Sequence, residues 1–180
     1  MVKRYQAGFM AGATAVDPFV TPETLYLTPS RDFSGFNDPK KGASAAQGLI
    51  GRGVDVIFDV TGDSGSVVRR AATKAGIGVI GADVDAARRV PKFEARAVFV
   101  SAVKCVDVAV FDFLSRFAAG KVKGGKVVYG MKNGGVCVTG NCPELDELTK
   151  KVAAGEIKVP APAVSPSHPR AGAFSWCDTT

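Results

Sequence analysis

The chain alternates between segments with helical periodicity and short runs of β-branched residues. Apolar residues recur every three to four positions in several segments, which predicts helices over residues 2–16, 40–52, 66–75, 103–119 and 144–154. Short apolar runs predict strands over residues 24–27, 54–60, 77–81, 97–101, 126–129 and 136–138. Because strands alternate with helices of ten or more residues, the pattern predicts an open α/β sheet built from parallel βαβ units.

Glycine and proline mark where these elements end. Gly76 and Gly155 follow helices, where glycine commonly forms the C-cap. Asn133-Gly134-Gly135 predicts a turn between the last two strands. The sequence after Pro160 is rich in proline and serine. We therefore predict one domain over residues 1–160 and an irregular tail over residues 161–180.

Composition indicates a soluble globular domain. The chain has 180 residues, of which 46% are hydrophobic and 22% are charged, and this is enough to bury a core. The net charge of +6 predicts a solvated basic surface, with an anionic membrane surface as the alternative. With one Trp, three Tyr and no nucleic-acid motif, we predict no nucleic-acid partner. Apolar runs are too short for a transmembrane helix, and the N-terminus lacks the apolar run of a signal peptide.

The four cysteines do not have the spacing of a metal site. Cys105, Cys137, Cys142 and Cys177 form no C-x-x-C pair, and the single histidine, His168, lies in the tail. Buried thiols are the favoured interpretation, and a Cys137–Cys142 disulfide is the alternative in an oxidising compartment.

The sequence has no nucleotide-binding motif. The glycine-rich residues 48–53 precede a strand instead of following one, and no Walker A sequence is present. We predict no metal and no cofactor.

Candidate binding residues follow the two clearest strands. Ligands of open α/β sheets bind at the carboxyl ends of the strands, where residues 61–65 and 82–85 lie. Gly62 permits close backbone approach. Asp83, beside Asp85, could accept hydrogen bonds from ligand hydroxyls, with helix capping as the alternative. Lys104 opens the predicted helix 103–119, where it either contacts a ligand or is surface charge.

Two further patterns in the sequence bear on its chemistry. Gly62-Asp63-Ser64-Gly65 matches the sequence around one class of protease nucleophile, but a triad needs a nearby base and the single histidine lies in the tail. We predict no catalytic residue, and a hydrolase using Ser64 or an acid pair remains an alternative. Tyr5 and Phe9 lie four residues apart on the first helix. Core packing is favoured for Phe9, whereas Tyr5 is better placed to stack on a flat ligand.

Residues 5–13 resemble the F-x-x-G-F-x-A-G-A segment of the basic membrane protein family. These proteins are substrate-binding lipoproteins of ABC transporters and include purine-nucleoside receptors. Further segments match family motifs in the same order, so that the resemblance covers residues 2–160. They are residues 36–42 (F-x-D-x-x-K-G), 53–58 (G-A-D-V-I-F), 62–65 (A-G-x-x-G), 80–85 (I-G-V-D-x-D), 101–104 (S-x-x-K), 129–136 (G-L-x-x-G-G-V) and 155–160 (G-E-I-x-V-P).

The resemblance implies a type I periplasmic-binding-protein fold, in which two α/β lobes hold a nucleoside between them. By this resemblance, the chain is expected to correspond mainly to the C-terminal lobe, with the N-terminal lobe missing. The resemblance implies that Tyr5, where the family has Phe, stacks on the base. Phe9 lies in the same motif. The resemblance also implies that the ligand approaches the backbone at Gly62, and that Asp83 and Lys104 form hydrogen bonds with the ribose or the base.

The same resemblance implies a function in transport without catalysis. The expected role is the solute-binding component of an ABC transporter, with a nucleoside as ligand and a permease as partner. The alternative is a half-protein that needs a partner chain for the missing N-terminal lobe. The family is extracytoplasmic and attached to the plasma membrane as lipoproteins. Without a signal peptide in this sequence, a cytoplasmic location is the alternative.

Overall fold

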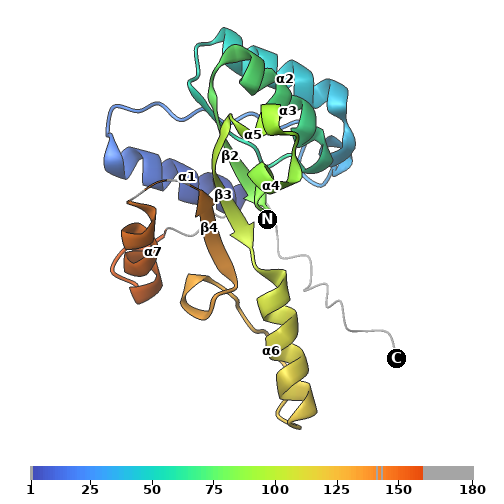
Figure 1. Ribbon diagram of the computed structural model, residues 1–180, viewed down its shortest axis with the longest axis vertical. Coiled ribbons are helices and arrows are strands. Elements are labelled where there is room, and N and C mark those ends of the chain that lie inside the picture. The colour runs from blue at the N-terminus through green and yellow to red at the C-terminus, as the bar shows by residue number, and fades with distance from the viewer. Residues whose placement is uncertain (1, 141, 143, 160–180) are drawn as a thin grey trace. The chain divides into compact units, whose positions relative to one another are not determined.

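A computed structural model describes residues 2–140, 142 and 144–159 of the chain (Figure 1). The chain divides into two compact units, one formed by Met1–Pro22 and Val159–Thr180 and the other by Glu23–Lys158. The first unit contains helix α1 (Val2–Val16), as the periodicity predicts. The second contains the sheet and the other described helices. The predicted tail, residues 161–180, lies outside the described residues, so the domain boundary at residue 160 stays a prediction.

The second unit is built on a four-stranded sheet in the order β1-β2-β3-β4. The strands are β1 (Val56–Phe58), β2 (Gly78–Asp83), β3 (Val98–Lys104) and β4 (Val136–Gly140). The first three strands are parallel, and β4 pairs antiparallel with β3. The α/β class and the parallel βαβ units are therefore confirmed, with one antiparallel strand added at an edge.

The longer helices of this unit lie close to their predicted positions. They are α2 (Pro39–Gly51), α3 (Gly65–Ala75), α6 (Val106–Ala118) and α7 (Leu145–Ala154). Asp38 caps α2 by accepting a hydrogen bond from the Lys41 N–H at 3.0 Å. Gly76 and Gly155 adopt the left-handed conformation after α3 and α7, as predicted for C-cap glycines.

Short helical segments are the elements that periodicity misses. The short α-helices α4 (Ala86–Arg89) and α5 (Lys92–Ala95) have four residues each, fewer than a periodic pattern needs. Single 3-10 turns, η1 (Ser34–Asn37), η2 (Gly62–Ser64) and η3 (Met131–Asn133), lie at loop positions.

Small apolar side chains fill the core between the sheet and its helices. One cluster joins α2, β1 and α3 through Ala46, Ile57 and Val68. The other joins α3, β2, α4 and β3 through Ala72, Val79, Ala86 and Val98. Ala72 and Val79 are fully buried. This packing holds β1, β2 and α3 in one layered body, and it fixes where the carboxyl ends of the strands lie.

Two predicted strands are wrong. Residues 24–27 and 126–129 are irregular, and the sheet ends at β1 and β4 without them. A strand is stabilised by pairing with a neighbour, so β-branched and aromatic residues alone do not create one. Val127 and Val128 are more than half exposed, and Tyr129 hydrogen-bonds to side chains of α6. The Gly134 turn is present, with a left-handed φ of 72°, but it joins a loop to β4.

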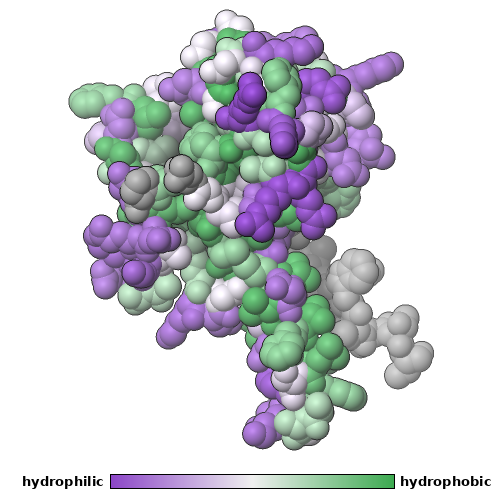
Figure 2. Space-filling model, in the orientation of Figure 1, coloured by the Kyte–Doolittle hydropathy of each residue, from purple (hydrophilic) through white to green (hydrophobic). Residues whose placement is uncertain are grey.

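Helix α6 packs little against the rest of the unit, and like α7 it has no buried residue. It projects beyond the end of β3 (Figure 1), and none of its residues is buried. Hydrophobic side chains make up much of the visible surface of this projection, with hydrophilic ones among them (Figure 2). The amphipathic helix is therefore confirmed as a helix, but its apolar side is exposed. Among the described residues, no helix has both the length and the apolar character needed to cross a membrane.

Candidate functional site

Three of the predicted site residues meet at the same edge of the sheet. Asp83 is the last residue of β2, Lys104 is the last residue of β3, and Gly62 begins the turn that follows β1. Because β1, β2 and β3 are parallel, their carboxyl ends share one edge. This is the edge where open α/β sheets bind ligands.

Asp83 and Lys104 form an ion pair at this edge. Lys104 Nζ lies 2.5 Å from Asp83 Oδ1, and the side chains are 33% and 49% exposed, respectively. The predicted position of Lys104 at a helix start is wrong. Residues 102–104 pair with β2 on one side and β4 on the other, which extends β3 and delays α6 to Val106. An exposed ion pair contributes only about 0–1 kcal/mol to stability, so both groups can exchange partners with a polar ligand at little cost.

The backbone at Asp83 is held in an uncommon conformation. Its φ is 69°, in the left-handed region, and the Val84 N–H donates to the Ala82 carbonyl oxygen at 2.8 Å. These features make Asp83 the centre of a γ-turn with positive φ, a rare and strained geometry. Such strain is concentrated at functional sites. The turn bends the chain sharply at the sheet edge, where the Asp83 carboxylate remains half exposed.

Gly62 is constrained by its own surroundings. Its φ of 63° favours glycine, and a Cβ at this position would lie 3.1 Å from the ring of Phe36 and 3.3 Å from the Phe36 carbonyl oxygen. The contact with Phe36 is therefore one reason for glycine here. The predicted reason for glycine here is the close approach of a ligand to the backbone. The contact with Phe36 does not test that prediction.

A buried carboxylate that the sequence analysis did not single out anchors the Gly62 turn. Asp59, only 4% exposed, follows β1. Its Oδ1 accepts hydrogen bonds from the Thr61 N–H at 3.1 Å and the Thr61 hydroxyl at 2.6 Å. Its Oδ2 lies 2.6 Å from Arg69 Nη1 on α3. A Cβ at Gly65 would collide with this carboxylate. Asp59 thus ties the strand, the turn and the next helix together.

Ser64 has a structural role in the same turn. Its side chain is fully buried, its hydroxyl donates to the Gly35 carbonyl oxygen at 2.8 Å, and it accepts from the Asp38 N–H at 2.7 Å. A nucleophile needs an accessible hydroxyl beside a base. The observed bonds instead hold the loop before α2 against the turn. His168, the single histidine, lies outside the described residues.

Tyr5 and Phe9 lie on α1, in the other compact unit. Their spacing of four residues places them on one side of that helix. Their participation in a site with Asp83 and Lys104 stays a prediction.

The cysteines pair differently from the predicted alternative. Cys137 Sγ lies 2.7 Å from Cys105 Sγ, whereas Cys142 donates a hydrogen bond to Glu144 Oε2 at 3.2 Å. Cys137 therefore faces Cys105 and not Cys142. The reason is the sheet, because β4 pairs with β3, the strand that leads directly to Cys105. In the described part of the chain, no three His, Cys, Asp or Glu side chains are grouped as metal ligands.

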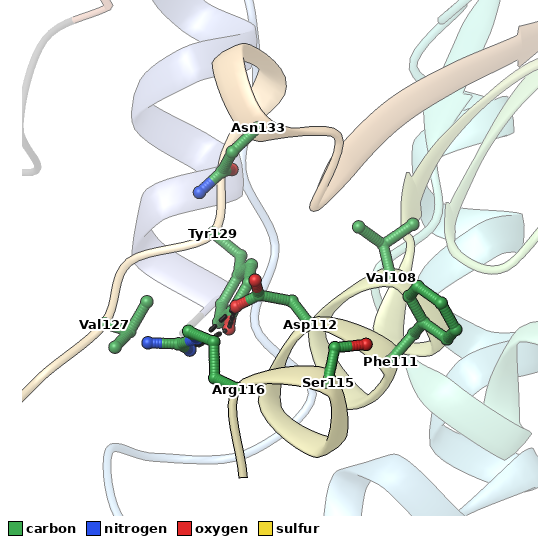
Figure 3. Close-up of a pocket in the computed structure, with 8 residues that line it drawn as sticks. All are labelled: Val108, Phe111, Asp112, Ser115, Arg116, Val127, Tyr129 and Asn133. Carbon is green, nitrogen blue, oxygen red and sulfur yellow. Dashed lines mark hydrogen bonds and ion pairs between the residues drawn. The ribbon is translucent and has the colours of Figure 1, made fainter. Parts of the chain in front are cut away.

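A hollow of about 420 Å³ lies beside α6 (Figure 3). Its lining includes Val108, Phe111 and Ser115 of α6, together with Asn133. Figure 3 shows Asp112, Arg116 and Tyr129 pointing toward one another.

A polar network closes one side of this hollow. The Tyr129 hydroxyl donates to Asp112 Oδ2 at 2.6 Å and accepts from Arg116 Nη2 at 3.0 Å. The hydrogen bond to Asp112 raises the pKa of Tyr129, because it stabilises the protonated phenol. The predicted site residues are not among the described residues that line the hollow. It belongs to the exposed α6 surface and not to the sheet edge.

Known structures share this fold. The chain superimposes on an ABC-transporter solute-binding protein from Conexibacter woesei with a TM-score of 0.68 at 23% identity, covering 88% of this chain and 53% of that one. A solute-binding protein from Aeropyrum pernix gives a TM-score of 0.65 at 22% identity, covering 88% and 54%. These likenesses confirm the fold, and the chain covers about half the length of each of these two solved structures.

Sequence relatives agree with the structural likeness. The CD4+ T-cell-stimulating antigen of Listeria monocytogenes is 29% identical, covering 89% of this chain and 49% of the relative. The ABC transporter nucleoside-binding protein BmpA of Lactococcus lactis is 29% identical, covering 76% and 41%. The chain thus spans about half the length of these relatives. Residues 1–165 match the family described as ABC transporter substrate-binding protein PnrA-like. This chain belongs to that family, the basic membrane proteins of ABC transporters.

Proposed function

We propose that the chain is the larger part of one lobe of a nucleoside-binding protein, which holds its ligand for an ABC transporter without chemical change. The observation that carries this proposal is the convergence of Gly62, Asp83 and Lys104 at the carboxyl ends of three parallel strands. Membership of the family and the nucleoside-binding name of the Lactococcus lactis relative support the ligand class.

Asp83 and Lys104 supply the polar contacts in this proposal. A carboxylate accepts hydrogen bonds from two neighbouring ribose hydroxyls, and an ammonium donates to a hydroxyl or a base acceptor. Both groups are partly exposed and already lie within contact distance of each other. The ligand therefore inserts into an existing polar pair instead of creating one, so less ordering accompanies binding.

The base has apolar partners in the proposal. Tyr5 stacks on it and Phe9 supports the same side of α1, while Gly62 leaves its backbone accessible to the ligand. A purine offers a flat π-face, for which an aromatic ring is the usual partner. Tyr5 keeps the stacking surface of the phenylalanine found in the family motif.

Calorimetric titration of the full chain with inosine, guanosine and adenosine tests the ligand class. Saturable binding of at least one nucleoside, with free ribose as a non-binding control, is the expected result. A chain that unfolds cooperatively but gives no heat with any nucleoside contradicts the proposal that this lobe binds alone. It favours the second candidate below.

Asp83→Ala is expected to weaken nucleoside binding by about 10- to 150-fold, because a hydrogen bond to a charged group contributes about 1.5–3 kcal/mol. The matched control is Asp55→Ala, which removes an exposed carboxylate that precedes β1 at the opposite end of the strand. Tyr5→Ala is expected to weaken binding, and Tyr5→Phe to preserve it. Equal affinity in wild type, Asp83→Ala and Tyr5→Ala contradicts the assigned site.

The proposal includes no turnover. Prolonged incubation with each nucleoside, followed by chromatography of base and ribose, is expected to return the nucleoside intact. Hydrolysis that is lost in Ser64→Ala would instead support the hydrolase alternative. The buried hydroxyl and its bonds to Gly35 and Asp38 argue against that outcome.

The proposed partner is the permease of an ABC transporter, at the extracytoplasmic face of the membrane where family members act. Crosslinking of the chain to a co-reconstituted permease, dependent on nucleoside, is the result that supports this partner.

A second candidate function follows from α6. Val106, Val110, Phe113, Leu114 and Phe117 form one stripe along this helix and are 47–67% exposed. Phe113 and Phe117 stack with ring centroids 6.3 Å apart. Contiguous exposed apolar surface of this kind marks an interaction site. This chain matches only about half the length of its relatives. We propose that a partner chain, equivalent to the half of the relatives that is not matched, covers this stripe.

Hydrogen exchange tests this second candidate. The probe is a polypeptide containing the half of the Listeria monocytogenes relative that this chain does not match. Its addition is expected to slow amide exchange across α6, while the amides of α3, already packed in the core, are unaffected. Protection of other surfaces with none on α6 contradicts this placement.

A further inference from the structure

Cys105 and Cys137 form a pair of thiols at the junction of β3, α6 and β4. Their Sγ atoms lie 2.7 Å apart, and both residues are half-buried. We propose that this pair is a modification site, at which a small-molecule disulfide such as oxidised glutathione converts the two thiols into an intramolecular disulfide. The resulting bond ties the start of α6 to β4.

The sheet register explains why these two residues meet. Val103 of β3 pairs directly with Cys137 of β4. Successive side chains of a strand alternate between faces, so Cys105, two residues beyond Val103, faces the same side as Cys137. The Cys105 N–H donates to the Gly135 carbonyl oxygen at 3.0 Å, which continues the pairing one step past β3. The two thiols are therefore diagonal neighbours held by backbone hydrogen bonds.

The surroundings of the two thiols assign them different roles. Cys105 is the N-cap residue of α6, a helix of 13 residues, and it lies where β3 gives way to that helix. Burial raises the pKa of Cys137 to about 11, and its hydrogen bond with Cys105 and the charges of Asp107 and Asp85 act in the same direction. A thiol with so high a pKa is a poor nucleophile at neutral pH, so Cys137 is assigned the resolving role and Cys105 the attacking one.

The reaction proceeds by two thiol–disulfide exchanges. Cys105 gives its proton to solvent and its sulfur attacks one sulfur of oxidised glutathione, which forms a mixed disulfide and releases one glutathione thiolate. Cys137 then gives its proton to solvent and attacks Cys105 Sγ, which releases the second glutathione. Two protein thiols are oxidised and one small-molecule disulfide is reduced to two thiols, so the electrons balance.

The disulfide would restrain the segment between Cys105 and Cys137, where α6 lies. Cys105 and Cys137 are 32 positions apart, and the loop between them contains α6, which has no buried residue. Closing a loop of this length is expected to raise Tm by roughly 5–15 °C. It also fixes the residue after Lys104, at the carboxyl end of β3.

Mass spectrometry of the reduced full chain, incubated with oxidised glutathione under native conditions, tests the site. The expected product has lost two hydrogen atoms, and a non-reducing digest contains a peptide that links Cys105 to Cys137. Cys142→Ser is the matched control and is expected to oxidise like the wild type. Cys137→Ser is expected to stop at a glutathione adduct on Cys105.

Several results overturn the proposal. These are a bond that joins Cys137 to Cys142 or Cys177, a persistent glutathione adduct on wild-type Cys105, and an unmodified folded chain. Circular dichroism establishes whether each serine variant is folded. If Cys137→Ser unfolds, peptide mapping of the wild type alone decides, because the linkage itself is the predicted result.

Discussion

Asp59→Ala is expected to lower the free energy of unfolding by about 3–5 kcal/mol, the usual result of breaking a buried ion pair by removing one partner. The substitution deletes the acceptor of two hydrogen bonds from Thr61. It also leaves Arg69, whose side chain is only 17% exposed, without the carboxylate at 2.6 Å. Urea titration followed by circular dichroism measures the change.

Two controls separate the ion pair from general effects. Asp55→Ala removes an exposed carboxylate only four positions away and is expected to change the stability by less than about 0.5 kcal/mol. The double variant Asp59→Ala/Arg69→Met removes both charges and is expected to recover part of the loss. Equal stabilities for Asp59→Ala and Asp55→Ala would show that the turn is held by other contacts.

The Asp59 anchor also connects stability with the proposed binding edge. Asp59 fixes Thr61, which immediately precedes Gly62, and it lies at the same carboxyl edge as the ends of β2 and β3. A variant that still folds is therefore expected to bind nucleoside more weakly, because the backbone of the Gly62 turn is less ordered. This expectation rests on the proposed function, whereas the stability loss does not.

Phe117→Asp is expected to abolish association through α6. Phe117 is 67% exposed at the end of the apolar stripe, and apolar surface of this extent favours self-association when its natural cover is absent. An aromatic residue that an interface buries commonly contributes about 2 kcal/mol or more, so a loss of at least about 30-fold in affinity is expected. Sedimentation velocity over a range of concentrations measures the self-association of wild type and variant.

The matched control is Phe33→Asp. Phe33 is 74% exposed but lies in the loop before η1, where it stacks on Phe36. Its replacement is expected to leave self-association unchanged. If both variants associate like the wild type, or if the wild type is monomeric at all concentrations, α6 is not the associating surface.

The candidate site shows which kinds of residue sequence reasoning could find. Gly62 and Asp83 were predicted because they follow clear strands, and the structure brings them to one edge of the sheet with Lys104. Asp59 was not singled out, because an aspartate at the end of an apolar run has no local sign of burial. Its importance comes from Arg69, ten positions later on α3.

Lys104 shows the limit of local periodicity. The pattern of Val106, Val110, Phe113 and Phe117 predicts a helix correctly, but it does not define the first residue. Hydrogen bonds from β2 and β4 compete for residues 102–104 and extend β3 through Lys104. The same competition moves the side chain from a helix surface to the end of a strand, beside Asp83.

The sequence by itself determined the α/β class, the main helices with the glycines that end two of them, and the family, because these depend on periodicity and on motifs contiguous along the chain. Only the tertiary structure decided which apolar runs become strands, that Cys137 faces Cys105, that Ser64 is buried, and that the apolar stripe of α6 is uncovered. The physical reason is that strand pairing and burial depend on partners far away in the sequence. Local propensity describes a residue's preference, whereas its neighbours in space determine whether that preference is met.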